Sequence, residues 1–248
     1  MKSDVDKVHV PIFIELDVYY DFTFRSAAMN MAIDETLLEV VTIPSIRFYR
    51  WNSPALSFGY FGKFADIADY ATERDLVRRW TGGGIVFHGD DLTYSIVIPA
   101  SDPIFGESSM SIYEKIHRAL CNALIATGQR ALVAGIVDPA AAVTDASYNG
   151  QCFGNPVRAD VMVNGRKVAG AAHRRTRAGL LHQGSIQLAT RRVRPTGGRV
   201  DLGNDLAERF AGELAEVCDE RSLTTRIEER ASEIAQQKYG TQNWLQRR

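Results

Sequence analysis

The sequence predicts an α+β fold in which helices pack on a mixed β-sheet. Two observations predict this class. Short strand-like runs alternate with a few amphipathic helices over the first 190 residues, and no internal repeat or low-complexity segment interrupts them. The chain has 248 residues, 45% of them hydrophobic, so it can bury a core without a disulfide or a metal ion. We therefore expect a single domain over residues 1–248, with an α+β core at 1–203 and a helical appendage at 204–248.

The first elements follow from their residue spacing. Met29, Ile33, Leu37 and Val40 recur at helical intervals, which predicts a helix that starts near Ser26. Residues 45–51 alternate as a strand does, and residues 55–60 follow the turn at 52–54 as the expected hairpin partner. A short polar helix is expected at 66–75, followed by strands at 76–80, 85–88 and 92–99.

The second half contains stronger local signals. Ser111 and Glu114 form a capping-box pattern that opens a second helix, and Gly128 ends it. Asn164-Gly165 predicts a type I′ turn between strands at 159–163 and 166–172, with a third strand at 181–189. After a loop that ends at residue 203 we expect two helices, the second opened by Thr225 and Glu228.

Composition excludes several classes of protein. There are 29 basic and 30 acidic residues, a net charge of −1, which argues against a nucleic-acid or anionic-membrane partner. No run of about 18 apolar residues and no apolar signal core occurs, so we expect a cytoplasmic protein. The three cysteines form no Cys-x-x-Cys or Cys/His cluster, so we expect neither a disulfide framework nor a bound metal, and any functional cysteine would act as a thiol.

The first candidate site is the segment from Arg78 and Arg79 through the triplet Gly82, Gly83 and Gly84 to His88. Three glycines in a strand connection expose backbone N–H groups, which a carbonyl, carboxylate or phosphate could approach closely. The spacing fits neither a P-loop nor a dinucleotide fingerprint, so a flexible hairpin tip is the alternative.

Two more candidates follow. Lys167 lies on a predicted strand among small residues, including Gly170, where its ammonium could bind an acyl carbonyl or a phosphate; a solvated edge lysine is the alternative. Cys152 lies in a loop between Gly150 and Gly154, where a thiolate could act as a nucleophile. The other two cysteines fall on predicted helices and are expected to be small apolar side chains.

Six motifs in this order resemble the lipoate–protein ligase and octanoyltransferase family, which is related to biotin–protein ligases. They lie at residues 46–51, 57–61, 78–88, 92–95, 165–170 and 181–185. The resemblance implies a mixed sheet with packed helices, a Lys167 that contacts the acyl carbonyl or acyl-adenylate, and a glycine-rich wall of an acyl tunnel. We expect the substrate-binding residues to be Arg78, Arg79, Gly82, Gly83, Gly84, His88, Gly170 and His182. For the two histidines, which fall on predicted strands, a hydrogen-bonded structural role is the alternative.

Within this family, Cys152-Phe153-Gly154-Asn155-Pro156 resembles the motif that carries the nucleophile of cysteine-type octanoyltransferases. That resemblance implies transfer of octanoate from octanoyl-acyl carrier protein, through a Cys152 thioester, to a lysine of lipoyl domains or of glycine-cleavage H protein, without a cofactor. However, residues 82–88 and Ala171-Ala172-His173 are closer to the ATP-dependent ligases, which would use ATP and Mg. A lipoyl-relay amidotransferase and a non-catalytic acyl-binding protein are further alternatives.

Overall fold

The computed structural model describes residues 10–89, 91–135, 158–187 and 202–247. An eight-stranded mixed sheet with the order β11-β1-β2-β6-β10-β9-β8-β7 forms the centre of the molecule, and a three-stranded sheet, β4-β3-β5, lies beside it. This confirms the predicted α+β class. The large sheet comprises β1 (Phe13–Arg25), β2 (Ser45–Trp51), β6 (Leu92–Pro99), β7 (Ala131–Val133), β8 (Val161–Val163), β9 (Arg166–Arg175), β10 (Gly179–Ile186) and β11 (Ala215–Arg221), and the small sheet comprises β3 (Ala55–Phe58), β4 (Asp75–Arg78) and β5 (Val86–His88).

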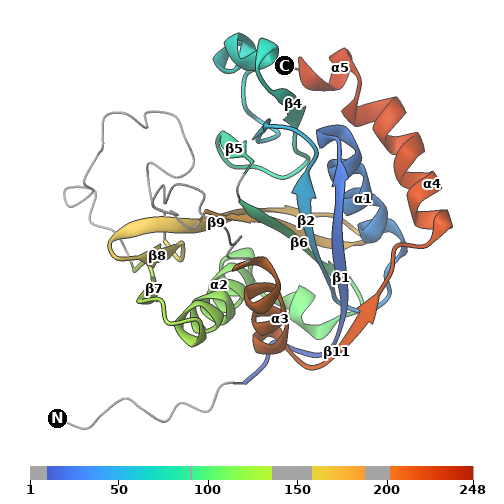
Figure 1. Ribbon diagram of the computed structural model, residues 1–248. Coiled ribbons are helices and arrows are strands. Elements are labelled where there is room, and N and C mark those ends of the chain that lie inside the picture. The colour runs from blue at the N-terminus through green and yellow to red at the C-terminus, as the bar shows by residue number, and fades with distance from the viewer. Residues whose placement is uncertain (1–9, 90, 136–157, 188–201, 248) are drawn as a thin grey trace, which may run out of the picture.

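Helices cover both faces of the large sheet, as Figure 1 shows. One face carries α2 (Ser109–Ala126) and α3 (Leu202–Leu214), and the other carries α1 (Ala27–Val40) and α4 (Thr225–Ile234). A π-helical turn at Ala235–Tyr239 and the short α5 (Gln242–Leu245) follow α4, and 3-10 turns lie at Phe64–Asp66, Ala68–Thr72 and Pro103–Gly106. None of the helices in these ranges is long and apolar enough to span a membrane.

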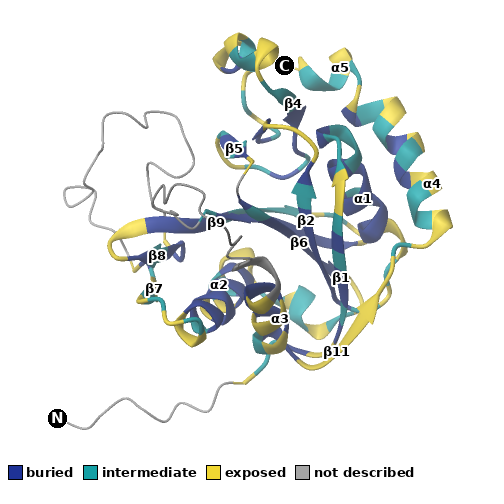
Figure 2. Ribbon diagram, viewed as in Figure 1, coloured by how far each residue is buried: buried dark blue, intermediate teal, exposed yellow. Residues whose placement is uncertain are grey.

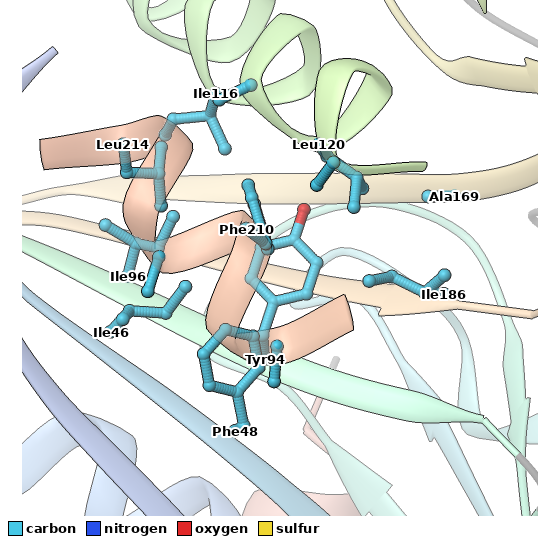
Figure 3. Close-up of a cluster of buried hydrophobic side chains, with 14 of the residues drawn as sticks. Ile46, Phe48, Tyr94, Ile96, Ile116, Leu120, Ala169, Ile186, Phe210 and Leu214 are labelled. Carbon is cyan, nitrogen blue, oxygen red and sulfur yellow. The ribbon is translucent and has the colours of Figure 1, made fainter. Parts of the chain in front are cut away.

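The larger core lies between the sheet and the pair α2 and α3. Alternating side chains of β2 and β6 point into it, and Phe210 of α3 packs edge-on against Tyr94 and Phe48. Figure 3 shows this cluster and Figure 2 shows that the central strands are buried. The opposite sides of the same strands face α1, so one set of strands supplies both a core and a wall for the site described below.

Several predicted elements are confirmed. Ser26 caps α1 by accepting a hydrogen bond from the Met29 N–H, and Gly128, with φ +85°, follows the C-cap of α2. Asn164 and Gly165 both have positive φ, as a type I′ turn requires. Two helices begin earlier than predicted. Ser108 caps α2 instead of Ser111, and Thr224 caps α4 instead of Thr225.

Two long-range pairings differ from the predictions. β3 pairs with β4 and β5 in the small sheet, so it is not the hairpin partner of β2. Residues 204–248 are also not a purely helical appendage, because β11 lies there and pairs in parallel with β1, a strand that the spacing did not predict. Because Phe210 and Leu214 of α3 belong to the main core, this segment is an integral part of the sheet and its cover.

Candidate active site

A cavity lies between the α1 face of the large sheet and the small sheet. It encloses about 410 Å³ of space between atoms, part of it open to solvent. Side chains or backbone from α1, β2, β3, β5, β6, β9, β10 and the glycine-rich segment line it: Met31, Tyr49, Trp51, Ser57, Arg79, Gly83, Val86, His88, Thr93, Gly170, Ala171, Ala172, Gln183, Gly184 and Ser185. Four residues predicted to bind substrate therefore meet here: Arg79, Gly83, His88 and Gly170.

The glycine-rich segment forms one wall of the cavity through its backbone. Gly83 has φ +86°, a conformation that strains other residues, and a Cβ at the facing Gly59 would lie 2.1 Å from the Gly83 carbonyl oxygen. Gly82 and Gly84 do not line the cavity themselves. Their carbonyl oxygens accept hydrogen bonds from Arg79 Nη2, at 3.0 and 2.8 Å, and so fix the guanidinium against the wall.

Arg78 does not face the cavity. Its guanidinium is buried and donates six hydrogen bonds of 2.7 to 3.3 Å to five backbone carbonyl oxygens, those of Tyr60, Gly62, Trp244, Leu245 and Arg247, with Leu245 accepting from two nitrogens. All five N–H groups of an arginine are thereby engaged. The Arg78 side chain thus ties the C-terminal turn to the small sheet and lies away from the cavity, so this geometry gives no support to its predicted substrate-binding role.

Lys167 is buried, which excludes a solvated edge lysine. Its Nζ lies 2.7 Å from Asp160 Oδ2, and Asp160 Oδ1 accepts a hydrogen bond from the Tyr113 hydroxyl at 2.7 Å. The ammonium also lies against the cavity wall, because a Cβ at Gly170 would be 2.8 Å from Nζ. A positive charge is therefore held beside the backbone of a lining residue, paired and hydrogen-bonded as burial of a charge requires.

His88 takes part in a buried polar chain. Its Nδ1 lies 2.8 Å from Asp91 Oδ2, and its Nε2 lies 2.6 Å from Ser57 Oγ. Burial alone would raise the pKa of Asp91. The adjacent His88 ring and hydrogen bonds from His88, Ser185 and the Gly89 N–H outweigh this effect and lower the pKa to about 2, so Asp91 is a carboxylate.

His182 points to the opposite side of the sheet from the cavity. Its Nε2 lies 3.2 Å from the Tyr94 hydroxyl, its Nδ1 lies 2.6 Å from His173 Nε2, and its ring packs against Tyr113 and His117 of α2. Burial lowers the pKa of His182 well below its usual value. Since alternate residues of a strand face opposite sides, the neighbouring Gln183 lines the cavity, and this geometry gives no support to the predicted substrate-binding role of His182.

The polar side chains of the cavity have partners within the protein. Gln183 donates to Asp34 Oδ2 and accepts from Thr81 Oγ1, both at 2.7 Å. Ser185 donates to Asp91 Oδ2 at 2.7 Å, and Thr93 donates to the same oxygen at 2.8 Å while it accepts from Trp51 Nε1 at 2.8 Å. Because these polar groups are already hydrogen-bonded within the protein, the accessible surface of the cavity is mostly apolar, which suits an aliphatic chain.

The predicted nucleophile Cys152 lies outside the described residues. Cys121 is buried in α2 and Cys218 is exposed on β11. Burial raises the pKa of the Cys121 thiol, and partial desolvation together with the neighbouring Asp219 charge raises that of Cys218, which keeps both protonated at neutral pH.

Four polar residues that shape the site were not among those predicted: Ser57, Asp91, Asp160 and Gln183. Asp91 had a signal in its spacing from His88, and Asp160 in its position before the strand that pairs with Lys167. Ser57 and Gln183 reach the cavity through strand pairings that are distant in sequence, for which a local pattern gives no sign.

Comparison with known proteins identifies the family. The model of the lipoyl protein ligase A/B catalytic domain matches residues 26–200. The chain belongs to this family. Among curated relatives, octanoyltransferase LipM of Oceanobacillus iheyensis is 36% identical over 179 residues, covering 69% of this chain and 63% of that protein. The match thus spans less than two thirds of that relative's length. Octanoyltransferase LipM of Symbiobacterium thermophilum is 31% identical, with 92% and 97% of the two chains covered.

Solved structures of the same family agree with the fold. A T. acidophilum protein described as a lipoate protein ligase, with bound lipoic acid, has a TM-score of 0.71 and 23% identity, covering 94% of this chain and 99% of that one. A lipoate-protein ligase A bound with ATP has a TM-score of 0.71 and 22% identity, with the same coverage. These similarities support the predicted lipoate ligase-like fold.

Proposed function

We propose that this protein is an octanoyltransferase that moves octanoate from octanoyl-acyl carrier protein, through a Cys152 thioester, to a lysine of a lipoyl domain or of glycine-cleavage H protein. The observation that carries the proposal is the buried Lys167–Asp160 pair beside Gly170, at the wall of a cavity whose polar groups are already hydrogen-bonded. The names of the curated relatives, octanoyltransferase LipM, support the octanoyl-transfer part of this proposal.

The residues divide the reaction between them. The Cys152 sulfur attacks the thioester carbonyl of the donor, its proton passes to the departing pantetheine thiol, and an octanoyl-thioester enzyme forms. The Lys167 ammonium and backbone N–H groups of the wall stabilise the oxyanion of the tetrahedral intermediate. The aliphatic chain occupies the cavity. The acceptor amine then attacks the thioester, the C–N bond forms as the C–S bond breaks, and the amine proton restores the Cys152 thiol.

Lys167 suits this role because of its fixed position. Asp160 holds the ammonium on one side, and the small residues of β9 let an acyl carbonyl approach its neighbour Gly170. A preorganised charge next to the reacting carbonyl needs no rearrangement as negative charge develops there. The thioester is already activated, so the proposed route uses neither ATP nor a metal ion.

The second candidate is an ATP-dependent lipoate ligase, favoured by the form of residues 82–88 and by Ala171-Ala172-His173. It would place Arg78 and Arg79 on the adenylate phosphate. Arg78 already donates all its N–H groups to backbone carbonyls, and Arg79 donates to Ser57, Gly82 and Gly84. The geometry therefore favours the transferase.

A transfer assay separates these functions. Purified protein is incubated with a lipoyl domain and either octanoyl-acyl carrier protein alone, or free octanoate or lipoate with Mg-ATP. We expect octanoylation of the lipoyl domain from the carrier protein without ATP, and its loss in Cys152→Ala. Modification that requires Mg-ATP and survives in Cys152→Ala would establish the ligase instead. Modification solely from an acylated lipoyl domain as donor would indicate a relay amidotransferase, and binding without product would indicate an acyl-binding protein.

A further inference from the structure

Three side chains in the cavity wall have the arrangement of a serine nucleophile with its base. Ser57 on β3, His88 on β5 and Asp91 follow one another at 2.6 Å from Oγ to Nε2 and 2.8 Å from Nδ1 to Oδ2. All three are buried, and Ser57 and His88 line the cavity. The pairing of β3 with β5 sets the first distance, because Ala55 lies opposite His88 and Ser57 opposite Val86.

The hydrogen bonds around Asp91 fix the direction of this chain. Its carboxylate accepts from the Gly89 N–H at 3.0 Å and from the hydroxyls of Thr93 and Ser185. Since a carboxylate is an acceptor, the Nδ1 of His88 carries a hydrogen toward it. With Nδ1 as the donor, Nε2 is placed to accept the hydrogen of the Ser57 hydroxyl. The Trp51 ring stacks on His88 with centroids 4.0 Å apart and holds the ring in this orientation.

Arg79 adds a positive charge at the same point. Its Nη1 donates to Ser57 Oγ at 2.7 Å, and its Nη2 is held by the carbonyls of Gly82 and Gly84. A fixed guanidinium beside an oxygen favours negative charge there, both on a developing alkoxide and on the oxyanion that forms when the alkoxide adds to a carbonyl. Base, orienting carboxylate and positive charge thus converge on one hydroxyl that lines the cavity.

We propose that Ser57 is a second nucleophile and that the protein hydrolyses short-chain acyl esters and thioesters at this site, independently of Cys152 and Lys167. Ser57 Oγ bonds to the acyl carbon as its proton passes to His88 Nε2. The bond from that carbon to the alcohol or thiol breaks, and the leaving group takes the proton from His88. Water then attacks the acyl-serine with His88 as base, which releases the carboxylic acid and restores the hydroxyl. We expect short acyl chains to react, because Ser57 is fully buried in the cavity wall and the acyl carbonyl has to enter the cavity to reach its hydroxyl.

Covalent labelling tests the nucleophile directly. The Cys152→Ala protein is treated with a fluorophosphonate, which phosphonylates activated serines, and digested with trypsin. Peptide 51–63 holds both Ser53 and Ser57, so fragment ions must assign the site. We expect Ser57 to be modified, and labelling to be lost in Ser57→Ala and His88→Gln. Ser45→Ala is the matched control, because it removes another buried hydroxyl, one without a hydrogen-bond partner and outside the cavity wall.

Hydrolysis of p-nitrophenyl butyrate gives the functional readout. With Cys152→Ala as the reference protein, we expect an added Ser57→Ala to lower the rate at least tenfold and an added Ser45→Ala to leave it within twofold. Labelling at another residue, an absence of labelling in Cys152→Ala, or full hydrolysis after Ser57→Ala is added to Cys152→Ala would overturn the proposal. The assignment by mass spectrometry needs no Ser57 variant, so it stands even where that variant fails to fold. Loss of octanoyl transfer in Cys152→Ala with Ser57 labelling intact would separate the two activities.

Discussion

Gly170→Ala tests how closely the ammonium must be placed beside the cavity wall. The added Cβ would lie 2.6 Å from Lys167 Cε and 2.8 Å from Nζ, and 3.3 Å from Asp160 Oδ1. Ordinary contact begins at 3.4 Å, so the lysine side chain must move by roughly 0.8 Å, the difference between 3.4 and 2.6 Å. The displaced atoms are the far end of a flexible side chain, so the fold has a low-energy way to adapt, whereas the charge leaves its position.

The expected cost falls on catalysis. A misplacement of about 1 Å lowers a rate by about 100-fold, which corresponds to ~2.7 kcal/mol of transition-state stabilisation. We expect kcat/KM for octanoyl transfer to fall on the order of 100-fold, with a melting temperature close to that of the unmodified protein. Gly106→Ala is the matched control, since its Cβ would meet no atom within 4 Å. A well-folded Gly170→Ala protein with full activity would refute the assigned role of Lys167.

Three further predictions concern charges within the fold. Asp160→Asn keeps the shape of the partner of Lys167 but removes its charge, and we expect kcat for octanoyl transfer to fall about tenfold with KM within twofold; an equal change in both constants would contradict a positioning role. Burial lowers the pKa of His117 to about 4, so the unfolded chain binds its proton first as the pH falls from 6.5, and the free energy of unfolding should fall by about 2 kcal/mol between pH 7.5 and pH 5. Urea unfolding at pH 7.5, 6 and 5 measures this, and a His117→Gln variant with the same pH dependence would disprove it. Arg78→Met leaves buried carbonyls without donors and should cost about 2–4 kcal/mol; hydrogen exchange should rise throughout α5, and unchanged protection there would contradict the anchoring role.

Local sequence signals predicted the elements that are stabilised locally. The cap at Ser26, the glycine that ends α2 and the Asn164-Gly165 turn each act over a few residues, and all three are found in the structure. β1 and β11 were missed because their residues show no clean alternation. β11 in particular is a charged, mostly exposed edge strand whose conformation depends on its pairing with β1.

The part of the site that lies within local sequence motifs could be predicted. Arg79, Gly83, His88 and Gly170 meet at the cavity, as the resemblance to the family implied. Arg78 and His182 lie in similar motifs but do not line the cavity. On β10, His182 faces the side of the sheet opposite to its neighbour Gln183, and a local pattern does not tell which of Arg78 and Arg79 faces the cavity. Ser57 was missed for the related reason that its partner, His88, comes from a strand 31 residues away.

The central claim is that octanoate passes through a thioester on the enzyme. Intact mass spectrometry after mixing the protein with octanoyl-acyl carrier protein, without ATP, tests it most directly. The account predicts a hydroxylamine-labile octanoyl adduct that is absent from Cys152→Ala and present in Ser57→Ala. If no adduct forms while a lipoyl domain is acylated from free acid and Mg-ATP, the thioester route is contradicted and Cys152 has no catalytic role.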